Sequence, residues 1–226
     1  MQNLKINLNP RQTAQTLFNF ASRGVASQAG VVTSKDCAAL VNVFDNFRKK
    51  GEGFVTPQRE RGRVIQEMQI CYLERLKMVP EELTEAIIPL ASCLESWFQQ
   101  FRLFAEPLAE NLRDTALLDT SFNSIGIHHY PAKTGGITPH RDFSSSLNLI
   151  VIFVLSGDAA LYTCQNRKGE AAEKVNCAPG SMVVLRAPRN QAEQRYRPFH
   201  YLTSSTTDRY SLIFRQETGP AGAGYA

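Results

Sequence analysis

Two histidines and one aspartate stand in an order that suits the binding of a metal ion. His140 and Asp142 are two residues apart, and His200 follows 60 residues after His140. Residues two apart on an extended segment point to the same side, so the first two side chains can reach one ion together. Two imidazoles and one carboxylate suit Fe(II) and leave coordination positions open for other ligands. We therefore predict that His140, Asp142 and His200 bind Fe(II).

Two arginines near the C-terminal end predict what else the site binds. If residues 208–215 form a β-strand, alternation places Arg209, Ser211, Ile213 and Arg215 on one face. A guanidinium pairs with a carboxylate through two parallel hydrogen bonds, which a lysine cannot match in geometry. Two arginines on a face that looks into a cavity therefore predict an anionic co-substrate.

The order and spacing of these motifs resemble the Fe(II)/2-oxoglutarate-dependent dioxygenase superfamily. The similarity covers residues 120–217, and the ending RYSLIFRQ at 209–216 is most similar to that of the AlkB-like oxygenases. The resemblance implies an oxidoreductase that uses Fe(II), 2-oxoglutarate as co-substrate, and O2.

The same resemblance implies which residues bind 2-oxoglutarate. Its far carboxylate would pair with Arg209, helped by Ser211 and by Tyr130 on an earlier strand. Arg215 would be a second cation of the active site. His128 shares a strand face with Tyr130, so we expect it to contact the co-substrate or the substrate.

Departures from the AlkB pattern concern the substrate. Ser144 stands where bacterial AlkB has an acid near the damaged base, and His128 replaces an asparagine. The candidate residues on the substrate side are Arg141, Ser144, Arg195 and Arg197. Two clusters of basic residues, within 186–197 and 48–63, are either solvated surface or contacts for an anionic substrate.

These features favour a dioxygenase that hydroxylates a C–H bond of a small polar or anionic metabolite and releases succinate and CO2. An alternative is an AlkB-like oxidative demethylase of nucleic acid, which would flip a methylated base into the pocket. A second alternative is a non-catalytic metal-binding sensor on the same fold. The net charge of +4 is too small by itself to indicate nucleic-acid binding.

The elements that position these residues change in type near the middle of the chain. Residues 1–119 predict a mainly helical region that buttresses the core. One helix covers 34–50, with Ser34 as its N-cap and Gly51 just past its end, and a second covers 80–101 with apolar residues at helical spacing. Residues 64–72 fit either a strand or a short helix.

Residues 120–217 predict a catalytic core rich in β-strands. Short runs of aromatic and branched residues alternate there with turn signals, at 124–130, 147–155, 160–164, 181–185, 199–202 and 210–214. Many short strands at this spacing indicate a sandwich or barrel. The resemblance implies an α+β fold, a double-stranded β-helix (jelly-roll, cupin-like) with the N-terminal helices packed on its larger sheet. Residues 218–226 are expected to form a flexible tail of one compact domain.

The composition fits a cytoplasmic protein. The 226 residues include no run close to the roughly 20 apolar residues of a membrane span, and the start lacks the order of a secretory signal. The five cysteines are odd in number and include no Cys-x-x-Cys pair, so neither zinc nor a disulfide framework is indicated. We expect a reducing compartment, a small-molecule partner and no membrane, and the oligomeric state stays open.

Overall fold

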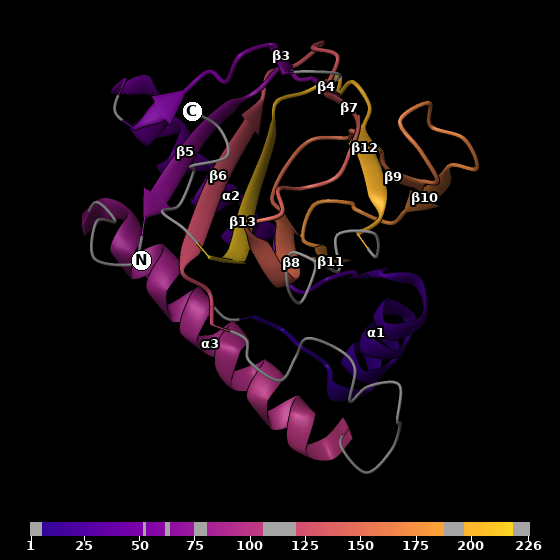
Figure 1. Cartoon of the computed structure of the whole chain (residues 1–226). Helices are drawn as coiled ribbons and strands as arrows, with labels where there is room; N and C mark the ends of the chain where they lie inside the picture. The colour runs from indigo at the N-terminus through magenta and orange to yellow at the C-terminus, as the bar shows by residue number, and fades with distance from the viewer. Residues whose placement is uncertain are drawn as a thin grey trace.

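Two antiparallel β-sheets form the body of the protein (Figure 1). The computed structural model describes residues 6–51, 53–61, 64–74, 81–105, 121–187 and 197–218. The expected tail, apart from residue 218, lies outside these residues. Among the helices that the structure describes, none has the length and apolar character needed to cross a membrane.

The larger sheet has seven strands, in the order β1-β11-β8-β13-β6-β5-β2. Their bounds are Val25–Gln28 (β1), Met182–Arg186 (β11), Ser146–Val154 (β8), Arg209–Glu217 (β13), Ser124–Tyr130 (β6), Gln69–Glu74 (β5) and Phe54–Val55 (β2). The smaller sheet has four, in the order β10-β9-β12-β7. Their bounds are Glu173–Val175 (β10), Leu161–Cys164 (β9), Phe199–Leu202 (β12) and Ile137–His140 (β7), and a short hairpin joins Glu60–Arg61 (β3) to Val64–Ile65 (β4). Facing antiparallel sheets of this kind confirm the predicted double-stranded β-helix.

Side chains alternate between two hydrophobic cores along the strands. On β13, Tyr210, Leu212 and Phe214 belong to the core under the helices, whereas Ile213 belongs to the core between the sheets. The period of two therefore leaves the intervening positions, Arg209 among them, on the face toward the smaller sheet. The chemistry of the site is built on that inner face.

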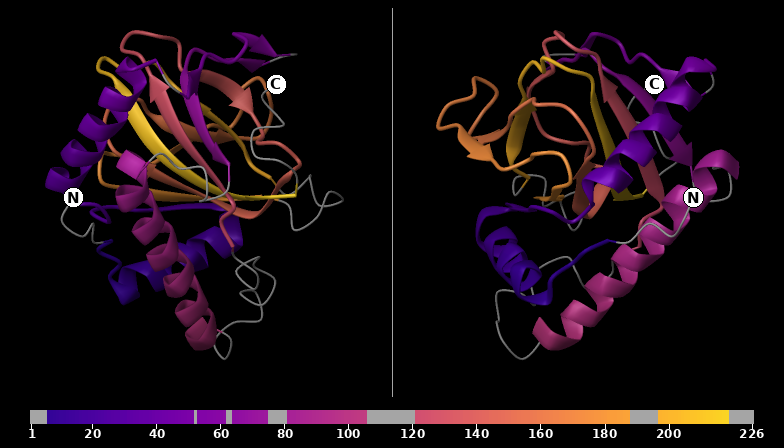
Figure 2. Two further views of the ribbon diagram at one scale, coloured as in Figure 1. Left: turned by 90° about the vertical axis from the view of Figure 1, so that its left-hand side faces the viewer. Right: turned by 180° about the vertical axis from the view of Figure 1, so that it is seen from behind.

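Three helices cover the outer face of the larger sheet. They are α1 (Pro10–Arg23), α2 (Ser34–Lys49) and α3 (Glu81–Ala105), and Figure 2 shows α2 lying across the strands. All three contribute buried apolar residues to the outer core, as predicted for the N-terminal helices. Tyr210 tethers α2 to β13, because its hydroxyl donates to Asp45 at 2.7 Å and accepts from Arg48 Nε at 2.9 Å.

The first half of the chain contributes more strand than its sequence indicates. β1, β2 and β5 all join the larger sheet, and the ambiguous residues 64–72 become β4 and the beginning of β5. The prediction also omits α1. The N-cap of α2 is Thr33 rather than Ser34, because Thr33 Oγ1 accepts from the Asp36 backbone N–H at 3.1 Å.

Candidate metal and co-substrate site

Strand pairing brings the three predicted metal ligands together. His140 on β7 and His200 on β12 are direct cross-strand partners, and Asp142 follows β7 by two residues. One ligand atom from each side chain lies within 4.8 Å of the other two. Oδ2 of Asp142 is 3.4 Å from Nε2 of His200. The three residues can therefore hold one ion from three directions, as the sequence predicts.

Backbone carbonyls fix the orientation of both imidazoles. Nδ1 of His140 lies 2.9 Å from the Thr138 carbonyl oxygen, and Nδ1 of His200 lies 3.3 Å from that of Pro198. A carbonyl only accepts, so each Nδ1 carries the proton and donates. Each Nε2 is then left with a lone pair for a metal ion.

The surroundings favour a neutral His140 imidazole and an ionised Asp142 carboxylate, which are the protonation states of metal ligands. Burial, reinforced by nearby His200, lowers the pKa of His140 to about 4, so that imidazole is neutral near pH 7. Burial raises the pKa of the Asp142 carboxyl, but the neighbouring His200 and Arg215 lower it more, and it lies below its usual range. A neutral imidazole and an ionised carboxylate bind a metal without first losing a proton.

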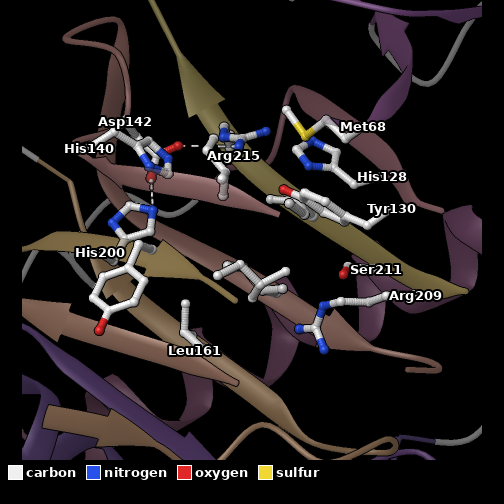
Figure 3. Close-up of a pocket in the computed structure, with 15 residues that line it drawn as sticks. Met68, His128, Tyr130, His140, Asp142, Leu161, His200, Arg209, Ser211 and Arg215 are labelled. Carbon is white, nitrogen blue, oxygen red and sulfur yellow. Dashed lines mark hydrogen bonds and ion pairs between the residues drawn. The ribbon is translucent and has the colours of Figure 1, made fainter. Parts of the chain in front are cut away.

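A cavity between the two sheets joins the triad to the predicted co-substrate residues. It encloses about 560 Å³, including its open part, and its polar lining consists of His128, Tyr130, His140, Asp142, His200, Tyr201, Arg209, Ser211 and Arg215. Figure 3 shows the triad on one side of this space and Arg209 with Ser211 on the other. β6 and β13 place Tyr130 opposite Arg209, and His128 opposite Ser211.

Arg209 is a buried cation, and two of its three guanidinium nitrogens lack a partner among the described residues. Its side chain belongs to a residue only 2% exposed, and among the described residues its Nε and Nη1 have no hydrogen-bond partner. Burial lowers the pKa of Arg209, yet a guanidinium stays charged in proteins. A buried unpaired charge is costly, so this arrangement fits a carboxylate that arrives with a ligand. The surroundings of Arg209 therefore fit a carboxylate of 2-oxoglutarate. The nitrogen and oxygen donors of the triad likewise fit Fe(II).

His128 presents a second buried polar atom to the same cavity. Its Nε2 has no partner among the described residues, and burial followed by the charge of Arg215 lowers its pKa well below the usual value. Gly126 makes room for this ring, because a Cβ there would lie 3.1 Å from His128 Nε2. His129 points the other way, with Nδ1 3.1 Å from Gln69 Oε1 and Nε2 3.2 Å from Asp208 Oδ2.

The predicted substrate-side residues line a second cavity beside the triad. It encloses about 870 Å³, including its open part, and contains Arg141, Ser144 and Arg197 next to His140 and Asp142. Arg195 lies outside the described residues. Sequence reasoning missed Arg167 and Phe143, which line this cavity, and Met68, which lines the first. Arg167 and Met68 stand near no motif in the chain, so only the fold reveals them, whereas Phe143 directly follows Asp142 but carries no polar group that would have singled it out.

Several residues of the basic clusters are already paired or lie elsewhere. Arg48 and Lys49 each form an ion pair with Asp45, and Arg59 forms one with Glu67. Arg186 lies over the ring of Phe20, at 5.6 Å from its centroid, on the side of the helices. These residues therefore do not extend the cavity lining.

No family model matches the sequence, and no curated protein does so either. Solved structures do resemble the fold. A prolyl hydroxylase from Trichoplax adhaerens, in complex with a peptide fragment of a hypoxia inducible factor, has a TM-score of 0.67 at 15% identity, covering 92% of this chain and 90% of its own. An oxidoreductase of the 2OG-Fe(II) oxygenase family from Burkholderia pseudomallei has a TM-score of 0.57 at 13% identity, covering 98% of this chain and 97% of its own. OsALKBH1 has a TM-score of 0.56 at 17% identity, covering 85% of this chain and 98% of its own.

These likenesses define the class of fold. The chain has the double-stranded β-helix fold of the 2-oxoglutarate/Fe(II) oxygenases, which confirms the fold expected from its motifs. The AlkB homologue shares this fold, as do the prolyl hydroxylase and the bacterial oxygenase. At such low identity the likeness concerns the fold, and the chemistry must be argued from the site.

Proposed function

We propose that the protein is an Fe(II)- and 2-oxoglutarate-dependent dioxygenase. It would hydroxylate a C–H bond of a small polar or anionic molecule and release succinate and CO2. The observation that carries this proposal is the buried guanidinium of Arg209, whose Nε and Nη1 have no partner among the described residues and which shares a cavity with a His-Asp-His cluster. The guanidinium suits a carboxylate and the His-Asp-His cluster suits Fe(II). A single ligand in the cavity could reach both.

The residues of the chain would divide the work as follows. His140, Asp142 and His200 would hold Fe(II), which with 2-oxoglutarate and O2 supplies the oxidant for the C–H bond. Arg209 would bind the far carboxylate of 2-oxoglutarate. The contribution of the protein is then to bind, to orient and to keep water out.

Three further side chains would complete the co-substrate site. Ser211 and Tyr130 lie on the same inner face as Arg209 and can hydrogen-bond a carboxylate beside it. His128, kept neutral by burial, can donate or accept a hydrogen bond within the cavity. Apolar side chains separate these groups and exclude water from the cavity, namely Met68, Ile137, Ile152, Leu161, Leu202 and Ile213.

We place the protein in a reducing compartment, the cytoplasm. All five cysteines are free thiols, and Cys37, Cys71 and Cys177 are buried. Such thiols are typical of chains that fold where disulfides do not persist, and Fe(II) is also kept reduced there.

The direct test is succinate formation from 2-oxoglutarate by protein supplied with Fe(II) in air. Wild type is compared with His140→Gln and with a matched control, His129→Gln. His129 is also a buried histidine, but it does not line the cavity. We expect succinate from wild type and from the control and none from His140→Gln. Equal rates in His140→Gln and wild type would refute the metal site. Absence of succinate from a wild type that binds Fe(II) would favour the sensor hypothesis.

A further inference from the structure

Three arginines converge on the cavity that adjoins the triad. Arg141, Arg167 and Arg197 all line the space of about 870 Å³ that also touches His140 and Asp142. They come from separate segments, since Arg141 lies between two triad residues, Arg167 follows β9, and Arg197 precedes β12. Folding has therefore gathered positive charge where a substrate would have to lie to reach the metal.

One aromatic ring lies beside two of these cations. The guanidinium carbon of Arg141 lies 4.1 Å from the centroid of the Phe199 ring, and that of Arg167 lies 5.9 Å from it. Phe199 directly precedes His200 on β12, so the ring is part of the strand that carries a triad residue. Stacking on an aromatic face leaves the edge of a guanidinium available for hydrogen bonds.

The described part of the chain does not pair Arg141 or Arg167 with an acid. No described carboxylate forms an ion pair with Arg141 or Arg167, and Arg141 Nε is buried without a partner. Among the residues that the structure describes, Asp142 is the only acid that lines the cavity. The two charges of Fe(II) would be balanced by Asp142 and by one carboxylate of 2-oxoglutarate. Arg141 and Arg167 would then remain uncompensated when the co-substrate is bound.

We propose that this cavity binds the anionic group of a small substrate, a carboxylate or a phosphate, through Arg141, Arg167 and Arg197. The inference rests on the proposed function, whose substrate class it names. The arginines hold the anion beside the triad and thereby set which C–H bond faces the metal. Guanidinium groups suit this task because they bind both carboxylates and phosphates through paired hydrogen bonds.

Charge placement favours a small anion over a nucleic-acid backbone. Backbone binding uses many cations spread along a surface, each facing a phosphate. Here three arginines converge on one cavity, whereas Arg48, Lys49 and Arg59 elsewhere are engaged with Asp45 and Glu67.

The test measures binding of simple anions to protein that already holds Fe(II) and saturating 2-oxoglutarate without oxygen. Saturation keeps the probes away from Arg209. Inorganic phosphate and acetate are titrated separately by calorimetry, together with a short single-stranded DNA. The variants are Arg167→Gln and Arg141→Gln. The matched control is Lys168→Gln, which removes the same charge from the neighbouring position, where the side chain does not line the cavity.

We expect one probe site per protein, and a dissociation constant raised about tenfold by Arg167→Gln and by Arg141→Gln but not by Lys168→Gln. Tighter binding of phosphate would identify a phosphorylated substrate, and tighter binding of acetate a carboxylate. The proposal is overturned if neither probe binds, or if Lys168→Gln weakens binding as much as Arg167→Gln. It is also overturned if the DNA binds more tightly than both probes with a steep dependence on salt.

This experiment can reject the substrate class without rejecting the oxygenase proposal. Formation of the Fe(II)–2-oxoglutarate complex is monitored by its visible absorption in every sample before a probe is added. If that absorption is normal and no probe binds, the substrate class is wrong and the oxygenase proposal stands. If the absorption is missing, the oxygenase proposal itself fails.

Discussion

The guanidinium of Arg215 donates a hydrogen bond to Oδ1 of Asp142 at 3.3 Å. A cation on the larger sheet thus contacts the carboxylate that completes the triad of the smaller sheet (Figure 3). Because Arg215 engages Oδ1, the second oxygen, Oδ2, is the one that faces His200 Nε2. Arg215 therefore orients the carboxylate, and its charge helps to keep Asp142 ionised.

Loss of Arg215 should loosen the metal site. We expect Arg215→Met to weaken the affinity for Mn(II), a stand-in for Fe(II) that is stable in air, by about 10–100-fold. Partners that orient a metal ligand typically have effects of this size. Mn(II) binding followed by electron paramagnetic resonance measures the change. Unchanged binding would contradict the orienting role of Arg215, and tighter binding would mean that its charge mainly repels the ion.

Arg209 should lower the free energy of unfolding when 2-oxoglutarate is absent and raise it when 2-oxoglutarate is bound. Without 2-oxoglutarate, we expect Arg209→Met to raise the free energy of unfolding by about 1–2 kcal/mol, because it removes a buried charge with unpaired nitrogens. Affinity for 2-oxoglutarate should fall about 100-fold. Thermal unfolding with and without the ligand measures both effects.

The ligand-induced part of that experiment has its own control. Wild type with Fe(II), in 2-oxoglutarate at about 100 times its dissociation constant, should gain about 2.7 kcal/mol, and Arg209→Met should gain only about 0.4 kcal/mol at that concentration. An equal gain in both proteins would place the carboxylate elsewhere.

The glycine beside His128 should not tolerate a side chain. A Cβ at Gly126 would lie 3.1 Å from His128 Nε2 and 3.6 Å from Arg215 Nη1. Gly126→Ala should therefore lower the free energy of unfolding by about 1–2 kcal/mol. In a His128→Ala background the same substitution should cost much less, which a double-mutant cycle detects. Additive costs would show that the two positions do not interact.

The hydroxyl that ties α2 to the larger sheet should affect stability but not the reaction. Tyr210→Phe removes hydrogen bonds with Asp45 and Arg48, at an expected cost of about 1 kcal/mol in urea unfolding. Tyr162→Phe is the control, because its ring stacks on Tyr201 in the smaller sheet, away from the helices. Succinate formation by Tyr210→Phe should match wild type. A large loss of activity would indicate that α2 controls the site.

The sequence predicts best the features that depend on local pattern. Alternation along β13 puts Arg209 and Ser211 on the cavity face, and the two-residue spacing puts His140 and Asp142 on one side, both without knowledge of the fold. The β6 boundaries, Ser124–Tyr130, are also those expected. Each of these features needs only neighbouring residues.

Features that depend on distant pairing could not be predicted in this way. β1, Val25–Gln28, is a strand because it pairs with Met182–Arg186, more than 150 residues later, and its four residues carry little signal of their own. Arg167 joins the second cavity through its contact with Phe199, which no spacing rule relates to it. The Thr33 cap was missed because adjacent threonine and serine are both good N-caps.

Anaerobic titration of the protein with Fe(II) and 2-oxoglutarate, in wild type and His140→Ala, shows whether the triad and the co-substrate form one metal site. The chelate formed by the two gives a weak visible charge-transfer absorption. We predict that the absorption develops in wild type and is absent from His140→Ala. Its absence from wild type would contradict the account, as would an equal absorption in the variant.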